Sequence, residues 1–114
     1  MADECLFCQI HQRRVPSASV YEDAELFAFR DIRPQAPTHI VIIPKQHIER
    51  VSDVDAATAP LMGRLTLAAN RIAQDQGLAS GYRLVVNCGR DGGQTVFHLH
   101  LHLLGGRPMS WPPG

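Results

Sequence analysis

The chain has 114 residues, enough for one domain around a single hydrophobic core and too few for two. It carries 11 basic and 11 acidic side chains, and the basic ones are scattered, which argues against a surface for long nucleic acid. The most apolar short run, Ile40–Ile43, is far below the roughly 20 residues that a bilayer span needs, so we expect no membrane partner. Three cysteines at spacings unlike a disulfide framework favour a reducing compartment, and we expect a cytoplasmic protein.

The first half of the chain predicts three strands. Residues Ser19–Glu22 and Leu26–Asp31 carry aromatic and β-branched side chains around a short polar turn, which is typical of a hairpin. Residues Thr38–Ile43 are β-branched and lie between two prolines, which cannot donate to a sheet ladder. They should form a third strand.

The middle of the chain predicts one long helix. From about Thr58 to Asp75, leucine, alanine and isoleucine recur at spacings of three and four residues, which is the period of a helix. Pro60 should lie in the first turn, where its missing N–H costs little, and Gly77 is a natural stop.

Two further strands are predicted at Tyr82–Asn87 and Thr95–Leu104, joined by a loop, residues 88–94, that contains three glycines. Residues 1–114 are therefore expected to form a single α+β domain with a five-stranded, mostly antiparallel sheet and one long helix.

The last predicted strand places histidines at every second position. Side chains alternate between the two faces of a strand, so Phe97, Leu99, Leu101 and Leu103 are expected to face the core. The opposite face would carry His98, His100 and His102 in a row. Neutral imidazole is both a metal ligand and a nucleophile near neutral pH, so the row alone leaves metal binding, catalysis and packing open.

The residues around this row favour an anionic ligand. Glycines in the preceding loop allow main-chain N–H groups to approach a phosphate, and Asn87 and Thr95 flank that loop with an amide and a hydroxyl. His39, at the start of another predicted strand, can meet the histidine row across the sheet.

The pattern His98-Leu99-His100-Leu101-His102-Leu103-Leu104, after Gly92-Gly93-Gln94-Thr95-Val96-Phe97, resembles the motif of the histidine triad (HIT) family. Other matching segments lie along most of the chain. They are Phe27–Ile32, Pro34–His39, Ile43–Ile48, Gly81–Arg83 and the ending Trp111–Gly114. The sequence is most similar to the Hint branch, the histidine triad nucleotide-binding proteins that act as adenosine phosphoramidases.

This resemblance implies a HIT-like fold with a short N-terminal helix and a homodimer whose two sheets join into one. It also implies hydrolysis of AMP or GMP phosphoramidates and acyl-adenylates through a nucleotidylated histidine, with no organic cofactor. A neutral histidine nucleophile would lose activity below about pH 6, near the ordinary histidine pKa.

Carried over by position, the resemblance makes His100 the nucleophile and His102 and His39 its supporting histidines, with Thr95 beside the leaving group. Many members have serine where this chain has Thr95, which puts leaving-group preference in doubt. The implied nucleotide contacts are His100, His102, Phe27, Phe29, Asp31, Ile32, Asn87, Gly93, Gln94, Thr95, Val96 and, reaching the partner subunit's site, Trp111.

The pair Cys5 and Cys8 has metal-ligand spacing, but one such pair supplies only half of a four-ligand zinc site. Many bacterial members of the family complete it with two histidines, which correspond here to His47 and His98. A structural zinc ion would then remove His98 from the chemistry, whereas two reduced thiols packed as small apolar residues would leave it there.

Three other functions remain open from sequence. One is a dinucleoside polyphosphate hydrolase of the same superfamily, and another is a non-catalytic nucleotide-binding or regulatory module. The third, metal storage by the histidine row, would leave the glycine loop and Asp31 without a purpose. His11 and Cys88 have no motif around them, and we expect no function for either.

Overall fold

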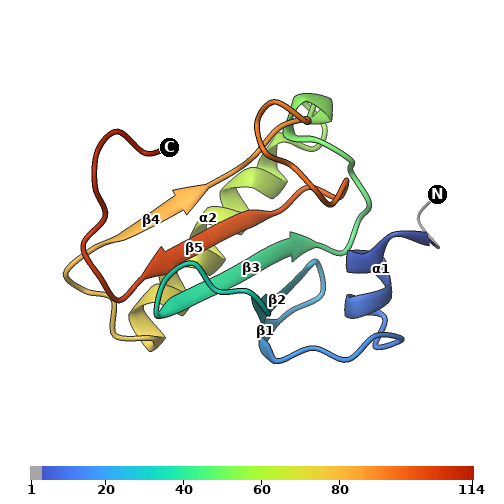
Figure 1. The fold of residues 1–114 in the computed structure, drawn as a ribbon. Coiled ribbons are helices and arrows are strands. Elements are labelled where there is room, and N and C mark those ends of the chain that lie inside the picture. The colour runs from blue at the N-terminus through green and yellow to red at the C-terminus, as the bar shows by residue number, and fades with distance from the viewer. Residues whose placement is uncertain (1–3) are drawn as a thin grey trace.

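The structure, a computed structural model, describes residues 4–114. Five strands form one sheet in the order β1-β2-β3-β5-β4, and every neighbouring pair is antiparallel. Figure 1 shows the long helix α2 lying across one face of this sheet. The short helix α1 lies at one end of the sheet, near the end of β3. The predicted α+β class, five-stranded sheet, long helix and short N-terminal helix are confirmed. The elements are α1 (Leu6–His11), β1 (Ser19–Glu22), β2 (Leu26–Arg30), β3 (Thr38–Pro44), a 3-10 turn (Val51–Asp53), α2 (Ala59–Asp75), β4 (Tyr82–Val85) and β5 (Leu101–Gly105).

The two faces of the sheet have different roles because side chains alternate along each strand. On one face, Ile40 and Ile42 of β3 pack with the buried stripe of α2 and with Leu99, Leu101 and Leu103. On the other face lies a smaller apolar cluster under α1. Its buried members are Phe7, Ile10, Phe27, Phe29, Val41 and Ile43.

Helix α2 keeps the predicted boundaries closely. Pro60 lies in its first turn, the helix ends at Asp75, and Gly77 adopts a φ of 74° just beyond it. Within residues 4–114, no helix combines the length and apolarity needed to cross a bilayer.

The predicted last strand is too long at its start. Residues Thr95–His100 are irregular and β5 begins only at Leu101, opposite Ile42. Strand β3 ends at Pro44, so the chain before Leu101 finds little further strand to pair with; instead the Leu99 N–H donates to the Ile48 carbonyl oxygen at 2.6 Å. Similarly, β4 ends at Val85 and not at Asn87.

The prediction that Phe97 faces the core is wrong, because Phe97 lies in the irregular segment before β5. It is 39% exposed, and the Arg50 guanidinium lies 5.2 Å from the centre of its ring. The next three alternate residues, Leu99, Leu101 and Leu103, are buried as predicted.

Candidate functional site

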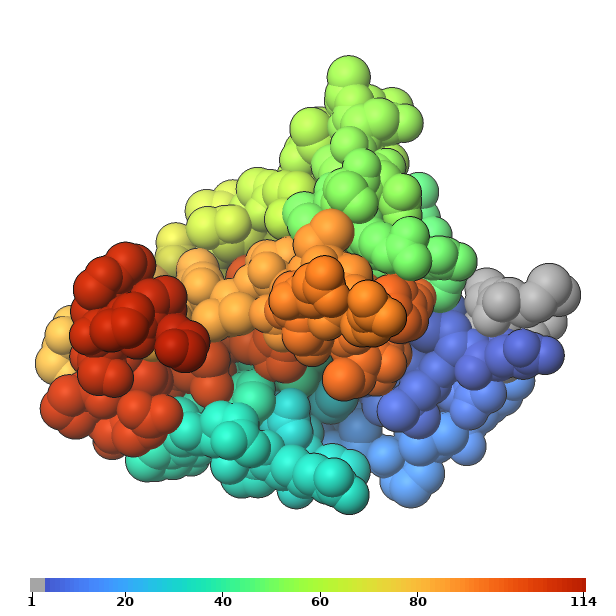
Figure 2. Space-filling model, turned by 45° about the horizontal axis from the view of Figure 1, so that its top comes forward, coloured from blue at the N-terminus to red at the C-terminus, as the bar shows by residue number. Residues whose placement is uncertain are grey.

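A cavity of about 600 Å³ lies on the face of the sheet opposite α2. It is walled by α1, the start of the β2–β3 loop and the glycine-rich loop before β5. Figure 2 shows these pieces next to one another: residues 31–37 in cyan, residues 86–96 in orange and α1 in blue. Most of the residues expected at the site line this cavity: Phe29, Asp31, Ile32, His39, Asn87, Gly93, Thr95, Val96, His100 and His102.

A larger hollow, of about 820 Å³, lies between the end of α2, β4 and the C-terminal segment. It contains no histidine, cysteine or carboxylate, so the smaller cavity is the candidate active site.

The main chain fixes which ring nitrogen of His100 carries the proton. Its Nδ1 lies 2.7 Å from the carbonyl oxygen of His98, and a carbonyl can only accept, so Nδ1 carries the proton. The lone pair of a neutral His100 is therefore on Nε2. Burial lowers the pKa of His100, although the main-chain hydrogen bond and Asp31 oppose the shift, so the ring is held in its neutral, nucleophilic form.

Two further histidines, His39 and His102, and the carboxylate of Asp31 lie beside His100. The His39 Nε2 is 2.9 Å from His102 Nδ1 and 3.5 Å from Asp31 Oδ2, and the His102 ring centre is 4.8 Å from that of His100. His39 and His102 meet diagonally across β3 and β5, in the register that pairs Val41 with His102. Burial, with the neighbouring His100 and His39, lowers the pKa of His102 to about 4.

Asp31, His39 and His102 are close enough to share a metal ion, but the proton on His39 opposes this. The main-chain N–H of Gln35 donates to His39 Nδ1 at 3.1 Å, which leaves the proton of a neutral His39 on Nε2. That nitrogen would have to be the metal ligand, so the geometry favours a hydrogen-bonded group over a metal site.

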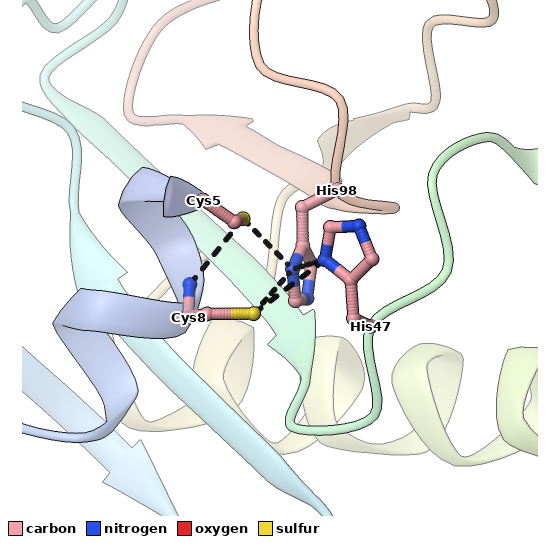
Figure 3. Close-up of side chains that lie close together, drawn as sticks. All are labelled: Cys5, Cys8, His47 and His98. Atoms are coloured by element: carbon pink, nitrogen blue, oxygen red, sulfur yellow. Dashed lines mark hydrogen bonds between the residues drawn. The ribbon is translucent and has the colours of Figure 1, made fainter. Parts of the chain in front are cut away.

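Figure 3 shows a second cluster, formed by Cys5, Cys8, His47 and His98. It adjoins the cavity, because Leu6 and Phe7, which lie between the two cysteines, line the cavity. Cys5 and Cys8 come from α1 and its cap, and face the two histidines across a small gap. His98 Nδ1 lies 3.3 Å from the Cys5 sulfur, 3.5 Å from the Cys8 sulfur and 3.1 Å from His47 Nδ1. The Cys8 sulfur is also 3.5 Å from His47 Nδ1.

These distances fit a tetrahedral metal site. With usual zinc bond lengths, ligand atoms are separated by about 3.3–3.8 Å, depending on whether they are nitrogen or sulfur. His98 Nε2 donates to the Pro44 carbonyl oxygen at 2.7 Å, so its Nδ1 has the lone pair toward the cluster. The residues present therefore fit a Cys2His2 metal centre. Burial is the main cause that lowers the pKa of His98 to about 4, which keeps the ring neutral as a ligand must be.

The two clusters are joined through His98 and Phe7. His98 turns its ring to the cysteines and its carbonyl oxygen to His100. Phe7, between the two cysteines, packs edge-on against His100 with ring centres 5.0 Å apart, and it lines the cavity. Phe7 is not among the residues expected from sequence at this site, although its place between the candidate metal ligands Cys5 and Cys8 was a signal that its position is constrained.

The glycine-rich loop is stabilised by Gln94. The Gln94 amide nitrogen donates to the carbonyl oxygens of Glu49 and Val96, and its amide oxygen accepts the Gly89 N–H. Gln94 is 5% exposed and does not line the cavity, so its side chain holds the loop and does not contact a ligand from there. Gly93, with a φ of 86°, turns the chain at the cavity edge.

Besides Gln94, two expected residues do not line the cavity, and a third lies only at its rim. Phe27 is fully buried behind the cavity wall, against Phe29. Trp111 is 83% exposed and does not line the cavity of its own chain. Ile32 does line it, but 92% of its surface is exposed at the rim.

The model of the HIT domain matches residues 12–109. A HIT-like protein of Synechococcus elongatus is 50% identical over 114 residues, the full length of both chains. A solved HIT family hydrolase from Legionella pneumophila has 54% identity and a TM-score of 0.96, over 97% of this chain and 100% of the other. A histidine triad nucleotide-binding protein from Candida albicans has 28% identity and a TM-score of 0.81, over 96% of this chain and 83% of the other. The chain therefore belongs to the HIT family.

Proposed function

We propose that the chain is a hydrolase of the Hint branch, which cleaves the P–N bond of purine nucleoside phosphoramidates and the corresponding bond of acyl-adenylates. The observation that carries this proposal is the bond from His100 Nδ1 to the His98 carbonyl oxygen, which leaves the Nε2 lone pair for attack inside the cavity. The relatives named as a HIT family hydrolase and as a nucleotide-binding protein support it.

In the proposed reaction, His100 Nε2 forms a bond to the α-phosphorus while the P–N bond breaks. The amine leaves with the bonding electrons and takes up one proton through the Thr95 hydroxyl, which lines the cavity and regains a proton from the water that attacks in the second step. Water then attacks the same phosphorus, the His100–phosphorus bond breaks, and the nucleoside monophosphate is released. His102, beside His100, supports both steps by contacting the phosphoryl group.

The cavity also suits a nucleotide. Phe29 and Phe7 supply apolar wall for a base, with Ile32 at the rim. Asp31 lies beside them with carboxylate oxygens for the ribose hydroxyls, and Gly93 faces the phosphate side. Purine as the preferred base is part of the proposal.

We also propose that Cys5, Cys8, His47 and His98 hold a zinc ion. Four protein ligands close the coordination shell, so the ion would cross-link α1 to the rest of the chain and would not activate water or substrate. The role of His98 is then structural, and its main-chain carbonyl still orients His100.

The proposed active form is a homodimer in which the β4 edges of two sheets pair. Strand β4 is an edge strand with main-chain groups available on one side. The other edge, β1, carries Glu22 in ion pairs with Arg13 and Lys45, and charged side chains on an edge discourage pairing.

The test of the proposed activity is intact-mass spectrometry after rapid quenching with adenosine phosphoramidate. We expect a protein population heavier by one adenylyl group, absent in His100→Ala. Side-by-side turnover of adenosine phosphoramidate and diadenosine polyphosphate separates the phosphoramidase from a dinucleoside polyphosphate hydrolase. Nucleotide binding without turnover of either compound would contradict the proposal and favour a regulatory module.

A further inference from the structure

A line of hydrogen bonds runs from the C-terminal segment to the histidines of the cavity through the main chain of Gln35. Arg107 donates from Nη2 to the Gln35 carbonyl oxygen at 2.9 Å. The N–H of the same residue donates to His39 Nδ1 at 3.1 Å, and His39 Nε2 lies 2.9 Å from His102 Nδ1. Arg107 and Gln35 are 72 positions apart in sequence, so the fold alone brings this line together.

The direction of each hydrogen bond in this line follows from the Gln35 N–H. A main-chain N–H can only donate, so His39 Nδ1 accepts and the proton of a neutral His39 is on Nε2. His102 Nδ1 then accepts that proton's hydrogen bond, and the proton of a neutral His102 is on its own Nε2. Burial lowers the pKa of both rings, which favours these neutral forms.

Gln35 is held in place by the turn that follows β5. Gly105, the last residue of β5, pairs with Thr38, so the chain leaves the sheet beside the β2–β3 loop. Gly106 then has a φ of 90° and approaches Pro37 so closely that an added Cβ would lie 2.9 Å from the Pro37 Cβ. This close approach brings Arg107 to the Gln35 carbonyl oxygen.

We infer that Gln35 and Arg107 are positioning residues of this site. The Gln35 N–H selects the tautomer of His39 and, through it, makes His102 an N–H donor toward the cavity, while Arg107 holds Gln35 in position. That the His102 N–H donates to a phosphoryl oxygen rests on the proposed function. The assignment of the His39 and His102 tautomers does not depend on it.

Loss of the Gln35 N–H would remove the constraint on His39. A proton on His39 Nδ1 would present a lone pair to His102, and His102 would then move its own proton to Nδ1. Its Nε2 would face the reacting phosphoryl group with a lone pair in place of a donor. A histidine in the wrong tautomer is costly in other enzymes, where it lowers kcat by up to about 10⁴-fold.

The test uses the 114-residue chain with ¹⁵N-labelled histidine. In wild type, long-range ¹H–¹⁵N spectra should identify His39 and His102 as Nε2–H tautomers. Gln35→Pro removes the main-chain N–H, whereas Gln35→Ala keeps it and serves as the matched control for the spectra. We expect Gln35→Pro and Arg107→Ala to mix or reverse both tautomers. Each should lower kcat for adenosine phosphoramidate about tenfold or more, with KM changed less than about threefold.

Two further variants separate positioning from general damage. Arg107→Lys retains a donor for the Gln35 carbonyl oxygen and should restore the wild-type spectrum and most of kcat. Arg64→Ala removes an arginine that pairs with Glu25 and lies outside the cavity, and should change neither readout. If Gln35→Pro does not fold, Arg107→Ala alone decides.

The inference is overturned if wild-type His39 carries its proton on Nδ1, or if kcat falls in Arg107→Ala while both tautomers keep the wild-type pattern. A wild-type protein with the expected tautomers and no turnover would contradict the proposed function and leave the tautomer assignment supported.

Discussion

His98 and His100 differ in which ring nitrogen donates to a main-chain carbonyl oxygen. The Pro44 carbonyl oxygen takes the Nε2 proton of His98, which leaves Nδ1 for the cysteines. Two residues later, the His98 carbonyl oxygen takes the Nδ1 proton of His100, which leaves Nε2 for the cavity. The side chains are identical, so the main-chain acceptor alone separates the proposed metal ligand, His98, from the proposed nucleophile, His100.

The pH dependence of this site should differ from that of an exposed histidine. The pKa of His102 is lowered to about 4 by burial and by the neighbouring His100 and His39, so the ring stays neutral well below the ordinary value of 6.5. We expect an NMR titration of His102 with a midpoint far below 6.5, and kcat/KM that remains level at pH 6 and falls only in more acidic solution. A midpoint near 6.5 would contradict this result.

The Thr95 hydroxyl should matter most when the leaving group needs a proton. Thr95→Val keeps the shape and removes the hydroxyl, so kcat for an amine leaving group should fall about tenfold or more. Hydrolysis of an acyl-adenylate, whose carboxylate leaves without a proton, should fall less. Thr95→Ser is the matched control and should retain turnover of both; equal losses on the two substrates in Thr95→Val would refute a proton-donating role.

Among the elements, helix α1 has the weakest support of its own. It spans six residues, Leu6–His11, which is too short for a stable isolated helix. It is attached by the apolar contacts of Phe7 and Ile10 and by the two cysteines of the metal-ligand cluster. Because Leu6, Phe7 and Ile10 also line the cavity, the anchoring of α1 shapes the proposed nucleotide pocket.

Metal removal should therefore weaken nucleotide binding without a direct contact between metal and nucleotide. Untagged protein should contain about one zinc per chain by elemental analysis. After chelation, or in Cys8→Ser, hydrogen exchange in residues 5–11 should accelerate and the Kd for AMP should rise at least about tenfold. Cys88→Ser is the control, because Cys88 is exposed and outside the cluster. Metal-free wild type with an unchanged Kd would disprove the coupling.

The elements differ in how well their sequences predicted them. Helix α2 and strands β1 to β3 were anticipated within a residue or two, because burial on one face produces a local period in the sequence. The alternation from Thr95 to Leu104 is equally regular, but the strand needs a partner, and β3 ends at Pro44. Alternation therefore indicated which leucines are buried but not where hydrogen bonding to the sheet begins.

At the scale of the whole molecule, Trp111 is 83% exposed and does not line its own chain's cavity. The proposed dimer would give it a role at the partner's site, and light scattering should then report twice the mass of the 12.6 kDa chain. A chain-length monomer at micromolar concentration would contradict the dimer.

Mixing two defective variants tests whether Trp111 acts in the partner's site. We expect Trp111→Ala to raise KM and His100→Ala to abolish turnover. After subunit exchange, a mixed dimer has one site with an intact His100 and with Trp111 from the partner. A population with wild-type KM should therefore appear on mixing, and its absence in a mixture shown to exchange subunits would refute the shared site.

The sequence by itself determined the α+β class, the long helix, the buried leucines and the histidine motif, because each is a local pattern of side-chain types. The meeting of Cys5 and His98 across 93 positions was expected only from the family resemblance, and the meeting of Arg107 and Gln35 across 72 positions was decided by the tertiary structure alone. The tertiary structure also decided which nitrogen of each histidine carries the proton, through the main-chain groups of Gln35, Pro44 and His98. A main-chain carbonyl or N–H group does not identify its residue type, so the local sequence does not show which of these groups will meet a histidine. Their positions depend on how the strands end and pack.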